Sequence, residues 1–121
     1  MRRMRTKSFL PDGDQLCLFV TGDKEGKVIF TDYGGAIDFA LQNTSALKIK
    51  ESDRAFLDKL VQDSGVFLHK DCLCVRLEED TIATRKDAID RLCKVVMAFT
   101  AFIDAQKYLP DGFTFTIVPV S

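Results

Sequence analysis

The stretch Gln15–Gly35, which reads QLCLFVTGDKEGKVIFTDYGG, decides the fold of this chain. It contains two apolar runs, Leu16–Val20 and Val28–Phe30, with the β-branched and aromatic residues typical of strands covered on at least one face. Between them, Thr21–Lys27 contains two glycines and four charged residues, a composition typical of a turn. The stretch therefore predicts a β-hairpin around which the rest of the chain is arranged.

The residues that follow the second run, Asp32, Gly34 and Gly35, predict a structural turn into a helix. Glycine permits a positive φ, and an aspartate accepts hydrogen bonds from the amides that open a helix. A carboxylate between a strand and glycines also occurs at catalytic and metal-binding positions. We expect Asp32 to cap the amides of residues 34–40, so that Asp32→Asn is nearly neutral and Gly34→Val is severely destabilising.

The composition is that of one domain with a substantial hydrophobic core, spanning residues 1–121. The chain is 46% hydrophobic, and its 17 basic and 18 acidic residues give a net charge of −1. The overall charge therefore attracts neither nucleic acid nor an anionic membrane. Four cysteines in apolar segments suit buried thiols in a reducing compartment, and no apolar run is long enough to cross a membrane. We expect a cytoplasmic protein.

Hydrophobic periodicity places the remaining elements. Further helices are expected over Ala36–Asn43, Asp53–Asp63 and Arg85–Tyr108, and further strands over Val66–Leu68, Cys72–Leu77 and Phe113–Val118. Ser52 is the expected N-cap of the second helix, and Thr81 or Thr84 that of the third. The order β-β-α-α-β-β-α-β predicts an α+β fold, in which a mainly antiparallel sheet of about five strands carries its helices on one face. The basic residues 1–8 are expected to form a mobile arm.

Three segments together resemble a known family: Asp12-Gly13-Asp14-x-Leu16-x-Leu18, Phe30-Thr31-Asp32-x-Gly34, and the Asp53–Gly65 helix that runs into Val66. The family is small, occurs in bacteria and prophages, and is known as the domain of unknown function numbered eighteen-twenty-eight. Its second segment usually begins with leucine and ends with a polar residue, where this chain has Phe30 and Gly35. The resemblance implies a bacterial or phage origin and implies no activity.

One pattern offers donors for zinc. His69-x-x-Cys72-x-Cys74, with Cys17 or Cys93 as a fourth ligand, contains suitable residue types. Structural zinc sites more often use pairs of cysteines two residues apart in a turn. We therefore expect buried thiols and a surface histidine, with no metal and no cofactor.

A second pattern resembles a magnesium-dependent nuclease. Pro11-Asp12 followed by Glu25-x-Lys27 echoes a motif whose carboxylates hold the metal and whose lysine assists the attacking water. In such enzymes the second half lies on a strand, whereas Gly26 places it in the hairpin turn. We therefore expect no catalytic residue.

Charged segments are the candidate binding surfaces. Acidic residues border both predicted hairpins and basic residues fill the N-terminal segment: Asp23, Glu25, Glu78, Glu79 and Asp80, and Arg2, Arg3 and Arg5. Because no active site is complete, we expect a non-enzymatic module that binds a protein partner. Small prophage proteins often obstruct a host protein, so inhibition of a host defence complex, as by an anti-CRISPR protein, is a specific form of this expectation. A nucleic-acid-binding protein or a divergent metal-dependent nuclease is the alternative.

A homodimer is also expected. The apolar surface of the last helix extends beyond its core stripe at Met97, Ala98 and Ala101, and Phe115 lies in a terminal strand with an edge available for pairing. A symmetric dimer would cover both features. The alternative is that these residues pack beneath the basic arm or a loop of the same chain.

Overall fold

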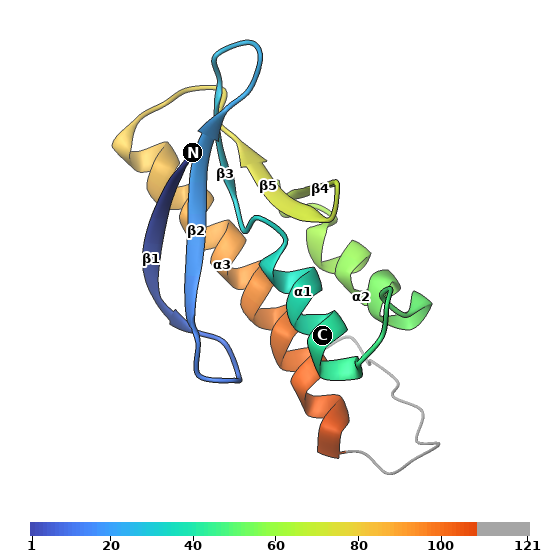
Figure 1. Ribbon diagram of the computed structural model, residues 1–121. Coiled ribbons are helices and arrows are strands. Elements are labelled where there is room, and N and C mark those ends of the chain that lie inside the picture. The colour runs from blue at the N-terminus through green and yellow to red at the C-terminus, as the bar shows by residue number, and fades with distance from the viewer. Residues whose placement is uncertain (109–121) are drawn as a thin grey trace, which may run out of the picture.

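The computed structural model describes residues 1–108 of the chain (Figure 1). In chain order the elements are β1 (Arg2–Phe9), β2 (Gln15–Gly22), β3 (Val28–Thr31), α1 (Gly35–Thr44), α2 (Glu51–Val61), β4 (Phe67–His69), β5 (Cys72–Arg76), α3 (Ile82–Ala105) and the 3₁₀ helix η1 (Gln106–Tyr108). The five strands form an antiparallel sheet in the order β1-β2-β3-β5-β4, with the helices on one face. This arrangement confirms the predicted α+β fold. The predicted strand Phe113–Val118, with Phe115, lies outside the described residues.

The N-terminal segment is a strand at the edge of the sheet, so the prediction of a mobile arm over residues 1–8 is wrong. β1 pairs with β2, and Met4 lies opposite Leu18 and packs against the core. A turn over residues 10–14 reverses the chain, closed by a hydrogen bond from the Leu10 N–H to the Asp14 carbonyl at 2.8 Å. Pairing with β2 satisfies backbone groups that a mobile arm would leave to water. The sequence did not predict this strand because the alternating positions of β1 contain mainly basic and polar residues, which show no alternation of apolar and polar side chains.

The hydrophobic core fills the space between the sheet and the helices. Fully buried side chains come from both layers: Leu18, Phe30 and Leu73 from the strands, and Leu57, Leu92 and Phe99 from the helices. Each such side chain stabilises the fold by about 1.5–3 kcal/mol relative to full exposure. Because strand side chains alternate between faces, this core uses only one face of the sheet.

The two longer helices begin differently from the predictions. Thr81 caps α3: its Oγ1 accepts a hydrogen bond from the Thr84 N–H at 3.1 Å, and Thr84 Oγ1 accepts one from the Thr81 N–H at 2.8 Å. The helix therefore starts at Ile82, directly after Thr81, one of the two predicted caps. The prediction placed the start at Arg85 because the exposed first turn lacks the apolar stripe. The N-cap of α2 is Lys50, not Ser52, and no side chain caps that helix. Acidic Glu51 in its first turn favours the earlier start through the helix dipole.

The capping pair yields a stability prediction. Thr81→Ala should lower the free energy of unfolding by about 1 kcal/mol, because alanine cannot accept the hydrogen bond from the helix end. Ser52→Ala is the matched control: Ser52 lies inside α2, so the change should leave stability unchanged or raise it slightly through helix propensity. Urea denaturation of both variants measures the two effects. Equal losses in the two variants would show that Thr81 is not a special position.

Candidate functional site

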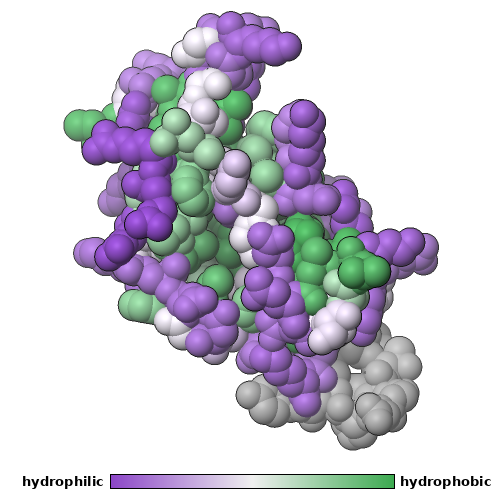
Figure 2. Space-filling model, in the orientation of Figure 1, coloured by the Kyte–Doolittle hydropathy of each residue, from purple (hydrophilic) through white to green (hydrophobic). Residues whose placement is uncertain are grey.

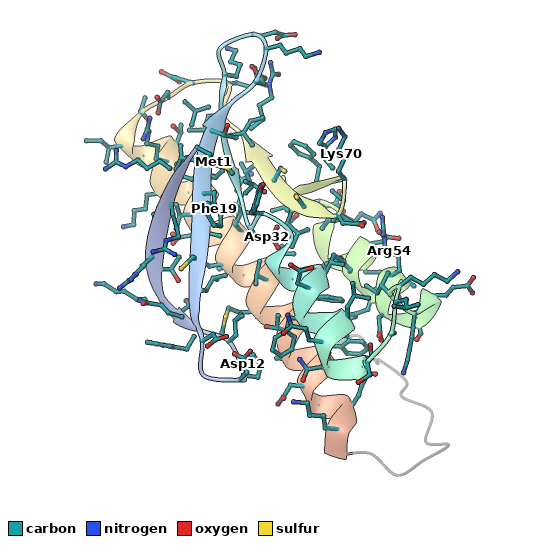
Figure 3. The ribbon with its side chains drawn as sticks, viewed as in Figure 1. Met1, Asp12, Phe19, Asp32, Arg54 and Lys70 are labelled. Carbon is teal, nitrogen blue, oxygen red and sulfur yellow. The ribbon has the colours of Figure 1, made fainter. Side chains whose placement is uncertain are left out.

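Asp32 lies at the end of β3, where the chain turns into α1 (Figure 3). It is 3% exposed. Its Oδ1 accepts hydrogen bonds from the N–H groups of Gly34 at 3.0 Å and Leu73 at 2.8 Å. Its Oδ2 accepts one from the N–H of Ala36 at 2.9 Å. Asp32 thus caps the start of α1 as expected, and the bond to Leu73 adds a link to β5.

The two glycines of this turn have different roles. Gly34 has a φ of 83°, in the left-handed region that favours glycine. Gly35 is the first residue of α1 and is not among the residues with positive φ. The turn therefore favours glycine at position 34, whereas the backbone at position 35 can accommodate other residues.

The surroundings of Asp32 fit a structural carboxylate. Burial raises the pKa of Asp32 above its usual value, although three backbone N–H donors favour the ionised form. Both of its oxygens are used by main-chain amides. This carboxylate holds the fold together and is not presented to a substrate.

Asp32→Asn should lower the free energy of unfolding by about 1–3 kcal/mol, in contrast to the nearly neutral effect expected from the sequence. An amide has one acceptor oxygen, so its NH₂ group would face a backbone N–H donor. Asp90→Asn, an exposed substitution inside α3 and away from this turn, is the control and should change stability by less than about 0.5 kcal/mol. Chemical denaturation at pH 7 measures both. An Asp32→Asn variant as stable as the wild type would show that the three hydrogen bonds of this carboxylate do not stabilise the fold.

A row of side chains crosses the face of the sheet that carries none of the helices described for residues 1–108, called the open face below. The strand registers place its members opposite one another in the order Arg3, Phe19, Thr31, Cys74, Phe67. Most of their immediate neighbours along the strands belong to the core or pack against it, among them Met4, Leu18, Phe30, Leu73 and Val75. This row therefore points away from the helices.

Aromatic rings stand on either side of two small residues in the middle of the open face. Thr31 and Cys74 are only 5% and 6% exposed, although no helix covers them. Phe19 and Tyr33 form a ring pair with centroids 5.3 Å apart, and Phe67 lies on the other side. Tyr33 is 59% exposed and Phe67 is 41% exposed. The open face thus presents large apolar surfaces to solvent, and Figure 2 shows apolar side chains over the sheet.

Strand β1 adds positive charge along one side of the open face. Arg3 lies opposite Phe19 and Arg5 opposite Cys17, and Lys7 continues the exposed positions of the strand. Arg2 lies opposite Val20, on the other face. Within residues 1–108, no salt bridge involves a residue of β1. These cations are therefore available to a partner.

A family model described as domain of unknown function DUF1828 matches residues 6–95, which is most of the chain. The chain belongs to this family. The resemblance deduced from the sequence is thereby confirmed, and the matched span contains the Asp32 turn and most of the open face. No curated protein and no solved structure matches. None of the helices described for this DUF1828 chain is long and apolar enough to span a membrane.

Most of the acidic residues predicted to bind a partner are paired within the DUF1828 chain. The pairs are Asp23, Glu25 and Glu78 with Arg76, at 2.6, 2.7 and 3.0 Å, and Asp80 with Arg85 at 2.6 Å. Glu79 is exposed and lies outside both groups. The structure brings three of the predicted residues together, but around an arginine that offsets part of their charge.

The Asp23–Arg76 pair makes stability depend on pH. The hydrogen bond from Arg76 holds the pKa of Asp23 below its usual value of 3.8, helped by the N–H groups of Lys27 and Glu25. A depressed folded-state pKa contributes stability above the unfolded value, and this contribution is lost as the pH falls through the folded value. The stability difference between the wild type and Asp23→Asn should therefore be constant near neutral pH and shrink below about pH 4. Denaturation series from pH 7 to pH 2 measure it, and a difference that persists unchanged to pH 2 would exclude the ion pair.

The nuclease pattern is not assembled in this DUF1828 chain. Asp12 lies in the turn before β2 and Glu25 in the turn after it, at opposite ends of that strand. A strand of this length separates them by roughly 26 Å. Carboxylates so far apart cannot hold one metal ion.

The zinc pattern also lacks a site. His69 lies opposite Cys72 across β4 and β5, yet residues 1–108 contain no group of three or more histidine, cysteine or acidic side chains that could hold a metal ion. Burial raises the pKa of the Cys72 and Cys74 thiols, which disfavours the thiolate that binds metals.

The residues predicted for a dimer interface differ in their surroundings. Met97 is half-buried and packs against the core of its own chain. Ala98 and Ala101 are exposed, and Ala98 lines a pocket of about 350 Å³ with Leu60 and Val95, between α2 and α3. Met97 thus contacts the core of its own chain, and both the dimer and the alternative of packing beneath the basic arm or a loop stay predictions.

Sequence reasoning missed the aromatic residues of the open face. Because Leu16–Val20 is apolar at nearly every position, alternation could not show that Phe19 points away from the core. Tyr33 was the one residue whose local sequence could have indicated a functional role, because an aromatic residue occupies a turn position where glycine or asparagine is usual.

Proposed function

We propose that this DUF1828 chain is a non-enzymatic binding module that engages its partner through the open face of the sheet. The observation that carries the proposal is that one sheet face presents the exposed aromatic residues Tyr33 and Phe67 and, at its β1 edge, arginines that form no salt bridge within residues 1–108. Exposed apolar patches bordered by polar residues mark interaction sites on soluble proteins. The buried carboxylate of Asp32 is used by backbone amides, which supports binding over catalysis at this turn.

The backbone at Tyr33 supports a functional role for its ring. Tyr33 has a φ of 53°, a left-handed conformation that costs a residue other than glycine about 1–2 kcal/mol. It is the one aromatic residue among the described residues with positive φ. Since the ring is mostly exposed, burial offsets little of this cost. Strain at an exposed aromatic side chain is typical of a residue retained for function.

A protein partner is the form of this proposal that the sequence favours. Aromatic residues and arginine are enriched at the centres of protein interfaces, and the open face contains both. Inhibition of a host defence complex is a specific form, supported by the resemblance to prophage-carried proteins. Such an inhibitor needs only to cover a functional surface of its target.

Substitutions on the open face should abolish partner binding while the fold is kept. Tagged protein is purified from bacteria as the wild type, as Tyr33→Ala/Phe67→Ala, and as the matched control Leu47→Ala/Ile82→Ala. Leu47 and Ile82 are large apolar residues that are almost fully exposed outside the open face. Material that co-purifies with the wild type, protein or nucleic acid, should be lost from the first variant and retained by the control.

Circular dichroism establishes that both double variants are folded. The proposal is wrong if the open-face variant retains the same material, if the control loses it equally, or if the wild type carries none.

A further inference from the structure

We infer that the open face binds single-stranded nucleic acid, with bases stacked on its aromatic rings and phosphates along β1. The inference rests on the proposed function in taking the open face as the binding surface, and it replaces the protein partner that the sequence favours with a nucleic acid that the geometry of this face favours. Three features carry it: the placement of the rings, the two small residues between them, and the charge of the edge strand, which no salt bridge within residues 1–108 compensates.

The rings stand at two separate positions across the sheet. Phe19, paired with Tyr33, lies on β2, and Phe67 lies on β4, three strand spacings or roughly 14 Å away. Single-stranded RNA and DNA are commonly bound by sheets on which successive bases stack on exposed aromatic side chains. The two positions would therefore hold different bases of one strand.

The floor between the rings favours bases over a protein surface. A protein interface usually has a contiguous apolar centre. Here the centre consists of Thr31 and Cys74, two small residues joined by a contact of 3.5 Å between the Cys74 Sγ and the Thr31 Oγ1. Flat bases standing against the flanking rings fit this arrangement without a continuous apolar patch.

The edge strand β1 is locally positive, although the chain as a whole has a net charge of −1. Arg76 and Arg85 are compensated by carboxylates, whereas Arg3, Arg5 and Lys7 form no salt bridge within residues 1–108. These three cations lie along the strand next to Phe19. A single strand whose phosphates meet these cations at the edge of the sheet would place one base on Phe19 and Tyr33. It would then cross the open face to place another base on Phe67, four strand spacings or roughly 19 Å from β1.

A duplex fits the open face poorly. Its bases are already stacked on one another and cannot stack on protein rings without being unpaired. Preference for a single strand over a duplex therefore separates stacking on Tyr33 and Phe67 from general attraction to phosphate.

Fluorescence anisotropy with fluorescein-labelled oligo(dT) and oligo(U) of about 15 nucleotides, and with a duplex of the same length, tests the inference. The single strands should bind more tightly than the duplex. With three phosphate contacts, the slope of log K against log salt should be about −2, so that affinity falls about 20-fold between 50 and 200 mM salt.

Variants separate the two contributions. Tyr33→Ala and Phe67→Ala should each weaken binding about 5- to 100-fold and leave the salt slope unchanged. Arg5→Ala should weaken binding and reduce the slope by about 0.7. Leu47→Ala and Lys86→Ala, matched exposed residues outside the open face, should leave affinity and slope unchanged. Should Tyr33→Ala fail to fold, Tyr33→Asn replaces it, because asparagine tolerates a positive φ.

Three results would overturn the inference. The first is no binding of either oligonucleotide at about 100 µM protein in low salt. The second is equal affinity for the single strand and the duplex. The third is a loss of affinity in Lys86→Ala as large as that in Arg5→Ala. If any of these occurs while the open-face double variant still loses a co-purifying protein, the proposed function stands with a protein partner and the nucleic-acid inference falls.

Discussion

The three hydrogen bonds accepted by the carboxylate of Asp32 hold the architecture together. They join the end of β3 to the first turn of α1 and to Leu73 of β5, a residue 41 positions away in the sequence. A buried N–H left without a partner costs about 1–3 kcal/mol, so the strands and the helix must meet at this point. The same turn sets Tyr33 in its left-handed conformation, from which its ring is exposed beside Phe19.

The alternation of the strands then divides the sheet between two tasks. One face supplies the core residues that pack against the helices, and the other retains aromatic rings that solvent reaches. β1 closes one side of the sheet with cations instead of a hydrophobic edge, which also protects an unpaired strand from aggregation. One face of the sheet therefore builds the core, and the proposed partner binding falls on the opposite face.

Local periodicity made much of this fold predictable, and non-local contacts account for what was missed. The strands flanking Thr21–Lys27 and the stripe of α3 carry their own signals, so their elements lie close to the predicted positions. β1 was missed because its cations obscured the alternation. The sequence could not show that Asp23 and Glu78 meet at Arg76, or that Phe19 and Phe67 share a row, because these contacts depend on strand register. The resemblance supplied the family, and it implied no activity.

Chemical-shift mapping by NMR tests directly whether the open face binds single-stranded nucleic acid, and the 13.6 kDa chain suits the method. Isotope-labelled protein is titrated with unlabelled oligo(dT), and the backbone amide shifts are followed residue by residue. The account predicts that the largest changes lie in β1 and around Phe19, Tyr33 and Phe67, with the outer surfaces of α2 and α3 unchanged. Largest changes on those helices, or no changes at all, would contradict it.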